Sequence, residues 1–234
     1  MVITPFLAMT AAEMRNISDF PPKLAWMACH FSPYGPGLSN VPERLSSQAM
    51  IILDDSTPFR EHDSGIIIRQ LWELVKNNDC SGVLLDFQRP GNPEAAALAL
   101  CLSQELPCPV IVSEFYAKDL LCPVCLPPVP LFTEPDQYLV PWKGRDIWLE
   151  ISPEGMHLTL SEQGCEAAPL PSPDRNRKGF ADKTLRCHYT IETNEKSAGF
   201  TLWRNADDLE QLLEDTHRLG VTEFIGLYQE FSQL

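Results

Sequence analysis

Short apolar runs alternate with amphipathic helical stretches through the first half of the chain. The runs are too short for buried helices and are apolar on both faces, which is typical of strands in a parallel sheet. Such alternation indicates right-handed crossovers between parallel strands. The predicted strands cover residues 24–31, 49–53, 82–87, 109–113 and 124–126, and the helices run from Asp63 to about Lys76 and from Asn92 to about Leu106.

The second half has a different rhythm, which indicates antiparallel hairpins. One hairpin is expected from residues 146–151 and 156–160, and another from residues 185–192 and 199–203. Residues 166–182 are rich in Pro, Arg, Asp and Asn and should form an exposed loop. Asn205 is placed to cap a last helix over residues 207–219, which Gly220 ends before a final strand over residues 221–227.

These seven or eight strands predict a single α/β domain over residues 1–234, with the hairpins inserted over about residues 147–200. A (β/α)8 barrel of the TIM type fits the pattern best, and an open doubly wound sheet is the alternative. A chain of 234 residues is long enough to bury one large core of this kind.

The net charge of −14 restricts the partners of the chain. Nucleic acid requires a basic face, and an anionic membrane surface would repel an acidic protein, so neither is expected as a partner. A neutral small molecule or oligosaccharide is compatible with this charge. No stretch approaches the roughly 18–20 apolar residues of a membrane span. The apolar start lacks the basic residues of a secretory signal, so a cytoplasmic location is expected.

The eight cysteines suit a reducing compartment, because many of them lie within apolar strands and helices. Cys122 and Cys125 form a lone CxxC motif without the second ligand pair of a zinc site, which leaves a metal or redox role as the weaker interpretation. The cysteines interpreted as small core residues are Cys29, Cys80, Cys101, Cys108 and Cys187.

A divalent cation could be held by Asp54, Asp55, His62 and Asp63, although Asp63 is better explained as a helix cap. No metal and no cofactor is therefore predicted. No predicted strand ends in lysine, which argues against a Schiff-base aldolase, and no glycine-rich phosphate loop is present.

An apolar run at Val83–Leu85 ends in Asp86, Phe87 and Gln88, and turn residues follow. This is the pattern of a buried parallel strand that delivers polar side chains to the rim of a barrel or sheet. Because Asp86 closes the apolar run, its carboxylate should be partly buried, and a buried carboxylate needs a partner or a functional role.

The same rule, applied to every predicted strand, gathers carboxylates and aromatic rings at one rim. In sugar sites, paired carboxylates perform the chemistry and aromatic rings stack on sugar faces, so this mixture favours a carbohydrate site. The rim residues are His30, Ser32, Tyr34, Asp54, Asp55, Asp86, Gln88, Arg89, Glu114, Tyr116, Glu150, Trp203, Arg204, Tyr228 and Glu230.

Residues Gly82 to Gln88 resemble the fourth-strand motif of family-18 glycosidases, in particular the branch with spore-cortex-lytic and chitinase-like barrels. That motif is an alternating row of aspartates that ends in a catalytic glutamate. Residues 185–228 also resemble the end of the family's chain, with a hairpin, a strand, a helix and a final strand. The resemblance implies the (β/α)8 fold and a carbohydrate ligand.

The chain departs from that motif at Ser81 and Leu84, where the family has aspartates, and at Gln88, where it has the catalytic glutamate. In the family, the aspartate that corresponds to Asp86 orients the substrate's N-acetyl group while the glutamate protonates the leaving oxygen. An amide cannot act as this acid, so the resemblance implies that acid catalysis at position 88 is lost. By the predicted count this strand is the third, which indicates a chain shortened near its start.

The sequence supports three hypotheses about function. The leading one is a family-18-like barrel that binds carbohydrate without the family's activity. The second is an active glycoside hydrolase in which Asp86 is nucleophile or orienter and Glu114 or Glu150 is the acid. The third is a non-enzymatic scaffold or interaction protein. Under the first hypothesis, the ligand-binding residues beside the carboxylates are Gln88, Tyr116, Trp203, Tyr228 and His30.

Overall fold

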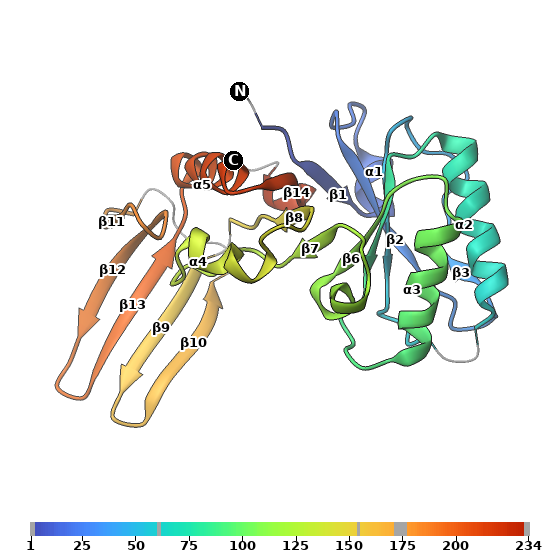
Figure 1. Ribbon diagram of the computed structural model, residues 1–234. Coiled ribbons are helices and arrows are strands. Elements are labelled where there is room, and N and C mark those ends of the chain that lie inside the picture. Colours follow the sequence, from blue (N-terminus) through green and yellow to red (C-terminus); the bar gives the residue numbers. More distant parts are fainter. Residues whose placement is uncertain (1–2, 60–61, 154, 171–176, 232–234) are drawn as a thin grey trace.

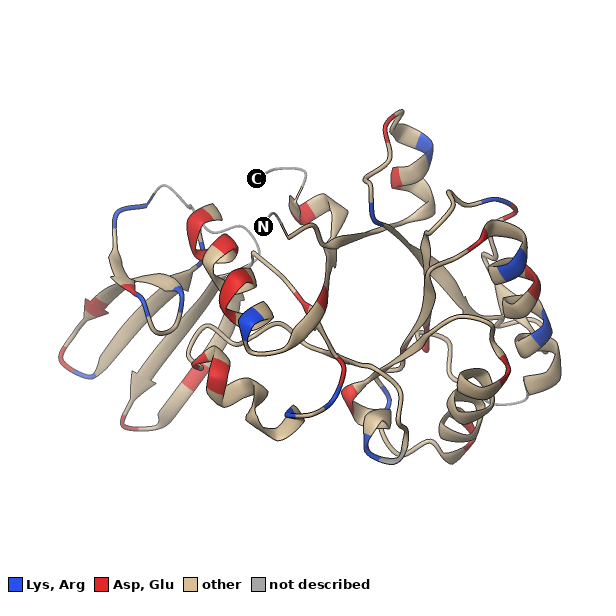
Figure 2. Ribbon diagram, turned by 45° about the horizontal axis from the view of Figure 1, so that its top comes forward, with Lys and Arg blue, Asp and Glu red and all other residues tan. Residues whose placement is uncertain are grey.

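The computed structural model describes residues 3–59, 62–153, 155–170 and 177–231. Within these residues, eight parallel strands close into a barrel, visible as a ring in Figure 2, in the order β1-β14-β8-β7-β6-β5-β4-β2. The pairing of β1 with both β14 and β2 closes the ring. The predicted barrel is confirmed and the open sheet is excluded. The strands are β1 (Phe6–Met9), β2 (Leu24–Phe31), β4 (Met50–Asp54), β5 (Gly82–Asp86), β6 (Val110–Ser113), β7 (Val124–Leu126), β8 (Ile147–Glu150) and β14 (Val221–Leu227).

Strand β1 is absent from the sequence-based prediction. Its four residues lie between Pro5 and Thr10 and are too few to show a clear periodicity. Thr10 then begins helix α1 (Ala11–Asn16) through a capping box with Glu13. With β1 counted, β5 is the fourth barrel strand, so the strand count from which a shortened start was predicted is wrong.

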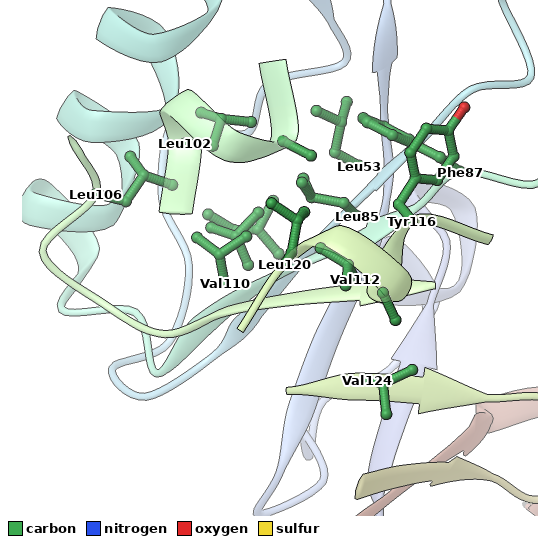
Figure 3. Packing of buried hydrophobic residues seen from close by; sticks show 14 of the residues in the cluster. Leu53, Leu85, Phe87, Leu102, Leu106, Val110, Val112, Tyr116, Leu120 and Val124 are labelled. Atoms are coloured by element: carbon green, nitrogen blue, oxygen red, sulfur yellow. The ribbon is translucent and has the colours of Figure 1, made fainter. Parts of the chain in front are cut away.

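Helices α2 (Ser64–Asn78) and α3 (Pro93–Glu105) begin where the sequence predicts, because Asp63 and Asn92 accept hydrogen bonds from the first backbone N–H groups. Their apolar faces pack on the outward faces of the strands and form the main core, part of which is shown in Figure 3. Asn205 caps α5 as predicted. The remaining helices are η1 (Glu114–Asp119), α4 (Pro135–Leu139), η2 (Val140–Trp142), α5 (Ala206–Arg218) and α6 (Tyr228–Phe231).

A second apolar cluster fills the inside of the barrel. Side chains alternate along a strand, so every second residue points towards the barrel axis. This cluster includes Met50 and Ile52 on β4, Leu84 on β5, Trp148 on β8 and Ile225 on β14. The next inward position on a strand, towards its carboxyl end, therefore lies above this apolar floor.

An antiparallel sheet, five-stranded in the described residues, follows β8 in the chain and projects away from the barrel in Figure 1. The order is β10-β9-β13-β12-β11, and the predicted hairpin of β12 with β13 is confirmed. The strands are β9 (Gly155–Ser161), β10 (Gly164–Leu170), β11 (Phe180–Asp182), β12 (Cys187–Thr193) and β13 (Ser197–Trp203), and a short β3 (Leu38–Ser39) pairs with β2.

Two predictions for this region are wrong. Residues 147–150 pair within the barrel, and β9 forms its hairpin with β10 instead. The loop expected over residues 166–182 includes most of β10 and all of β11, while residues 171–176 lie outside the described residues. Strand β10 contains Pro169 and an exposed Glu166, which suggest a loop in the sequence but are tolerated in an edge strand.

The cysteine predictions hold in part. Cys29, Cys80 and Cys187 are buried, whereas Cys108 is half-buried and Cys101 is exposed. The assignment of Cys101 to the core is wrong because position 101 falls on the outward face of α3. Cys125 belongs to the cluster inside the barrel. In the described part of the chain, no helix is both long and apolar enough to span a bilayer.

Candidate functional site

A cavity of about 340 Å³ lies at the carboxyl ends of the barrel strands. Barrel enzymes hold their ligands at this face. The volume is at the small end of the range for ligand pockets, which is about 300–1,000 Å³. Apolar residues form most of its lining, and the described residues contribute four carboxylates. The lining residues are Asp54, Asp86, Glu150, Glu230, Ala8, Met27, Ile52, Leu84, Pro128, Ile151, Ser152, Ile225, Gly226 and Leu227.

Strand register places Asp54 and Asp86 side by side. Each follows an inward apolar residue by two positions, Ile52 on β4 and Leu84 on β5, so both carboxylates point into the barrel mouth. The two aspartates are partners in the pairing of β4 with β5. Both strands therefore end in an acid at the same level of the barrel.

Glu150 enters the cavity from the other side. It follows Trp148 on β8 by two positions, and β6 and β7 separate β8 from β5. In a barrel of eight strands, this separation makes Asp86 and Glu150 face each other across the mouth.

Glu230 reaches the same cavity from α6, the single helical turn that follows β14. Gly226 on β14 permits this arrangement, because a Cβ atom there would lie 2.5 Å from the ring of Phe231 and 3.0 Å from Ile151. Without a side chain at position 226, α6 can pack close to the end of β8 and carry Glu230 over the mouth.

Burial and the negative charges around the cavity raise the pKa values of two of its carboxyl groups, Glu150 and Asp86. Burial, together with the charges of Asp86, Glu114 and Glu230, raises the pKa of Glu150 to about 7. Burial also raises the pKa of Asp86, an effect that the hydrogen bond from Gln88 opposes and the charges of Asp54 and Asp55 reinforce. A carboxyl group with a pKa near 7 can donate or accept a proton at neutral pH.

Gln88 is held over Asp86 by its side chain and by its backbone. Its Nε2 donates a hydrogen bond to Asp86 Oδ1. The buried carboxylate of Asp55 accepts hydrogen bonds from the backbone N–H groups of Gln88 and Arg89, each at 3.0 Å. Asp55 therefore fixes the turn after β5, and with it the position of the amide beside the cavity.

Three other predicted residues lie near the mouth but are not among the described residues that line the cavity. Glu114 begins η1 directly after β6 and is close enough to raise the pKa of Glu150. His30 is the register partner of Asp54, and its Nδ1 lies 3.2 Å from the carbonyl oxygen of Ala28. Tyr228 begins α6 and packs on the apolar cluster around Met9.

Two residues predicted to contact the ligand are buried and are not among the described residues that line the cavity. The ring of Tyr116 packs edge-on against Phe87 in the main core, with 5.7 Å between ring centroids (Figure 3), and its hydroxyl donates to the carbonyl oxygen of Arg89. Trp203 is 1% exposed and stacks on His188. The sequence prediction assumed that polar and aromatic residues at the ends of barrel strands reach the rim. This strand-end rule applies to neither residue, because Trp203 ends a strand of the antiparallel sheet and Tyr116 lies within η1.

Asp54 and Glu230 line the cavity, although the sequence analysis assigned neither of them a catalytic or ligand-binding role. Asp54 carried a usable signal, because it ends the apolar run Met50–Leu53 in the same way that Asp86 ends its own run. Glu230 was likewise among the predicted rim residues, but its direction depends on how α6 packs, which the sequence does not show.

The cation site considered at Asp54, Asp55, His62 and Asp63 is not assembled. Asp63 caps α2, Asp55 holds the turn after β5, and His62 Nε2 lies 2.8 Å from the carbonyl oxygen of Ser32. Within the described ranges, no group of three or more His, Cys, Asp or Glu side chains is placed to hold a metal ion.

No protein-family profile matches the chain, and no curated protein sequence matches it. Among solved structures, the spore cortex-lytic enzyme SleL of Bacillus cereus is similar with a TM-score of 0.60 and 12% identity, over 96% of this chain and 70% of that chain. SleL of Bacillus megaterium QM B1551 gives a TM-score of 0.58 and 11% identity, over 96% and 69%. A Bacillus subtilis protein described as a sporulation-specific glycosylase, YdhD, gives 0.53 and 6%, over 76% and 78%. At these identities the likeness shows the fold alone, which is a (β/α)8 barrel.

Proposed function

We propose that the protein binds carbohydrate in the barrel mouth without the acid catalysis of family-18 glycosidases. The observation that carries the proposal is the hydrogen bond that the amide of Gln88, an exposed residue at the rim, donates to Asp86, which lines the cavity. In the family that this strand resembles, the residue at position 88 is the glutamate that protonates the leaving oxygen. Gln88 has the length of a glutamate and donates a hydrogen bond to Asp86, but it has no acidic proton.

The composition of the cavity supports a sugar as the ligand. Carboxylates accept hydrogen bonds from sugar hydroxyls, and an apolar lining suits the C–H faces of a pyranose ring. The fold neighbours support the proposal at the level of fold only. A non-enzymatic scaffold is less favoured, because its barrel mouth would not require a cavity of about 340 Å³.

A thermal-shift screen with oligosaccharides of chitin, peptidoglycan and plant type tests the proposal. A sugar at about 100 times its dissociation constant stabilises the folded state by about 2.7 kcal/mol, which raises the Tm of a chain this long by about 5–10 °C. Asp86→Ala should abolish the shift, whereas Glu105→Gln, at the exposed end of α3, should retain it. If none of these sugars shifts the Tm, the proposal is wrong.

Hydrolysis by a different acid is the second candidate, favoured by the pKa of about 7 at Glu150. In this alternative, Glu150 protonates the leaving oxygen and Asp86 acts from the opposite wall of the mouth as the second carboxylate.

Release of reducing ends from the sugars that bind tests this alternative. Glu150→Gln should lower the rate at least about 100-fold. The wild-type rate should fall as the pH rises through about 7, because the acid must carry its proton. Glu114→Gln should leave the rate largely unchanged if Glu150 is the acid. A comparable loss of rate in Glu114→Gln alone would assign the role to Glu114 instead. Binding without any reducing-end release would exclude hydrolysis and leave carbohydrate binding intact.

A further inference from the structure

The charge around the cavity is of one sign. The described residues that line it include four carboxylates and no Lys, Arg or His side chain. The cation next in sequence to the site, Arg89, has an exposed side chain whose guanidinium donates to the carbonyl oxygen of Ser56. Asp54, Asp86 and Glu150 therefore have no compensating cation among the described residues of the lining, and Figure 2 shows acidic positions (red) on the ring of strands.

A neutral sugar does not require several carboxylates in its binding site. Hydroxyl groups are satisfied by neutral acceptors as well as by carboxylates, whereas grouped carboxylates beside an apolar lining repel one another. A cation bound between them would relieve this repulsion. A protonated amine on a sugar ring supplies such a cation and three hydrogen-bond donors in one group.

We propose that the site selects an amino sugar whose amine is free and protonated over the N-acetylated form of the same sugar. This inference rests on the proposed carbohydrate-binding function and specifies its ligand. The ammonium group lies between Asp54 and Asp86 on one wall of the cavity and Glu150 on the other. The ring lies on the apolar floor formed by Ala8, Ile52 and Ile225.

Binding of an ammonium group at this place must also move a proton. The group favours the charged form of Glu150, whose pKa in the free protein is about 7, so binding at pH 6–7 releases protons from the protein. Among the residues that the structure describes, no neighbour of Glu150 supplies a compensating positive charge. The titratable groups that face it are Asp54 on β4, Asp86 on β5, Glu114 on η1, Cys125 on β7, Tyr138 on α4 and Glu230 on α6.

Isothermal titration with glucosamine oligomers and N-acetylglucosamine oligomers of equal length tests the inference. At pH 6.5 and low salt, we expect the free-amine oligomer to bind at least tenfold more tightly. This preference should shrink as the ionic strength rises. Titrations in two buffers with different ionisation enthalpies should show proton release for the free-amine oligomer and none for the acetylated one.

Two variants separate the role of the cavity from the general acidity of the chain. Glu150→Gln removes one charge of the lining and should reduce the preference several-fold and abolish the proton release. Glu105→Gln removes an equal charge from an exposed site on α3 and should leave both unchanged. Equal or tighter binding of the acetylated oligomer would overturn the inference while leaving carbohydrate binding intact. Failure of both oligomers and of every neutral sugar to bind would overturn the proposed function as well.

Discussion

Asp55 shows how one side chain outside the cavity shapes the site. It is 6% exposed and accepts two backbone hydrogen bonds from the turn after β5, so its charge is satisfied by N–H groups instead of a cation. A buried carboxylate that accepts two backbone hydrogen bonds holds the turn tightly. The position of the Gln88 amide over Asp86 therefore depends on a residue from the neighbouring strand's loop.

Replacement of Asp55 by alanine should destabilise the protein by about 3 kcal/mol, because two partly buried backbone hydrogen bonds lose their charged acceptor. Asp55→Asn keeps one acceptor oxygen and should lose less. Urea unfolding of the three proteins measures the difference. Equal stability of Asp55→Ala and the wild type would contradict the role assigned to this carboxylate.

Glu150 should make stability depend on pH in a defined direction. Its pKa is about 7 in the folded protein against an ordinary value of 4.5, so the unfolded chain loses this proton first as the pH rises. Below about pH 4.5 the group is neutral in both states and has no effect. Between these values the unfolded state binds fewer protons, and stability falls, reaching a loss of about 3 kcal/mol above pH 7.

Glu150→Gln removes this penalty. The variant should match the wild type at pH 4 and be more stable by about 3 kcal/mol at pH 8, as measured by urea unfolding at both values. Glu105→Gln serves as the exposed control. A constant difference between Glu150→Gln and the wild type across this pH range would show that burial of Glu150 is not coupled to its ionisation.

At the scale of elements, the unit from β5 to α3 connects the site to the main core. Strand β5 ends at Asp86, the turn carries Gln88, and Asn92 begins α3 by accepting hydrogen bonds from the N–H groups of Glu94 and Ala95. Phe87, which lies between the two polar site residues, points outward into the core with 0% exposure. Because side chains alternate along this segment, Phe87 packs in the core while Asp86 and Gln88 lie at the site.

Asn92→Ala should destabilise the protein by about 1 kcal/mol, because the first turn of α3 loses its cap. Asn92→Asp retains an acceptor at the same place and should restore most of this stability. Thermal unfolding compares the variants. Loss of equal size in both would show that the amide nitrogen of Asn92, which lies 3.4 Å from the carbonyl oxygen of Phe59, matters more than the cap.

At the scale of the whole molecule, closure of the barrel depends on β1, the short strand nearest the N-terminus. Strand β1 has only four residues, yet it hydrogen-bonds to β2 on one side and to β14 on the other. The backbone N–H of Leu7 donates to the carbonyl oxygen of Lys23 at 2.9 Å. A closed barrel has no edge strand, and Leu7 and Ala8 have register partners on both sides.

Leu7→Pro should therefore destabilise the protein by roughly 3 kcal/mol or more, since it removes a ladder hydrogen bond and adds a ring between paired strands. Leu7→Ala preserves the N–H and tests the loss of the half-buried side chain alone. Far-UV circular dichroism and urea unfolding report the outcome. Equal stability of the two variants would mean that the β1–β2 pairing contributes little to closure.

The sequence alone predicted the barrel, because strand–helix alternation and helix caps are local signals that Asp63, Asn92 and Asn205 carry within a few residues. It also pointed to Asp86 and Gln88, since an apolar run that ends in polar residues marks the carboxyl end of a buried strand. The strand-end rule identified which residues reach a rim, but it did not specify which of them share one cavity.

The tertiary structure determines which of the rim residues share the cavity. Register between β4 and β5 placed Asp54 beside Asp86, the barrel's curvature set Glu150 opposite them, and close packing at Gly226 brought in Glu230. Pairing between distant segments also closes the barrel through β1 and places Trp203 in the separate antiparallel sheet. These relations join residues far apart in the chain, and periodicity within a short window carries no information about them.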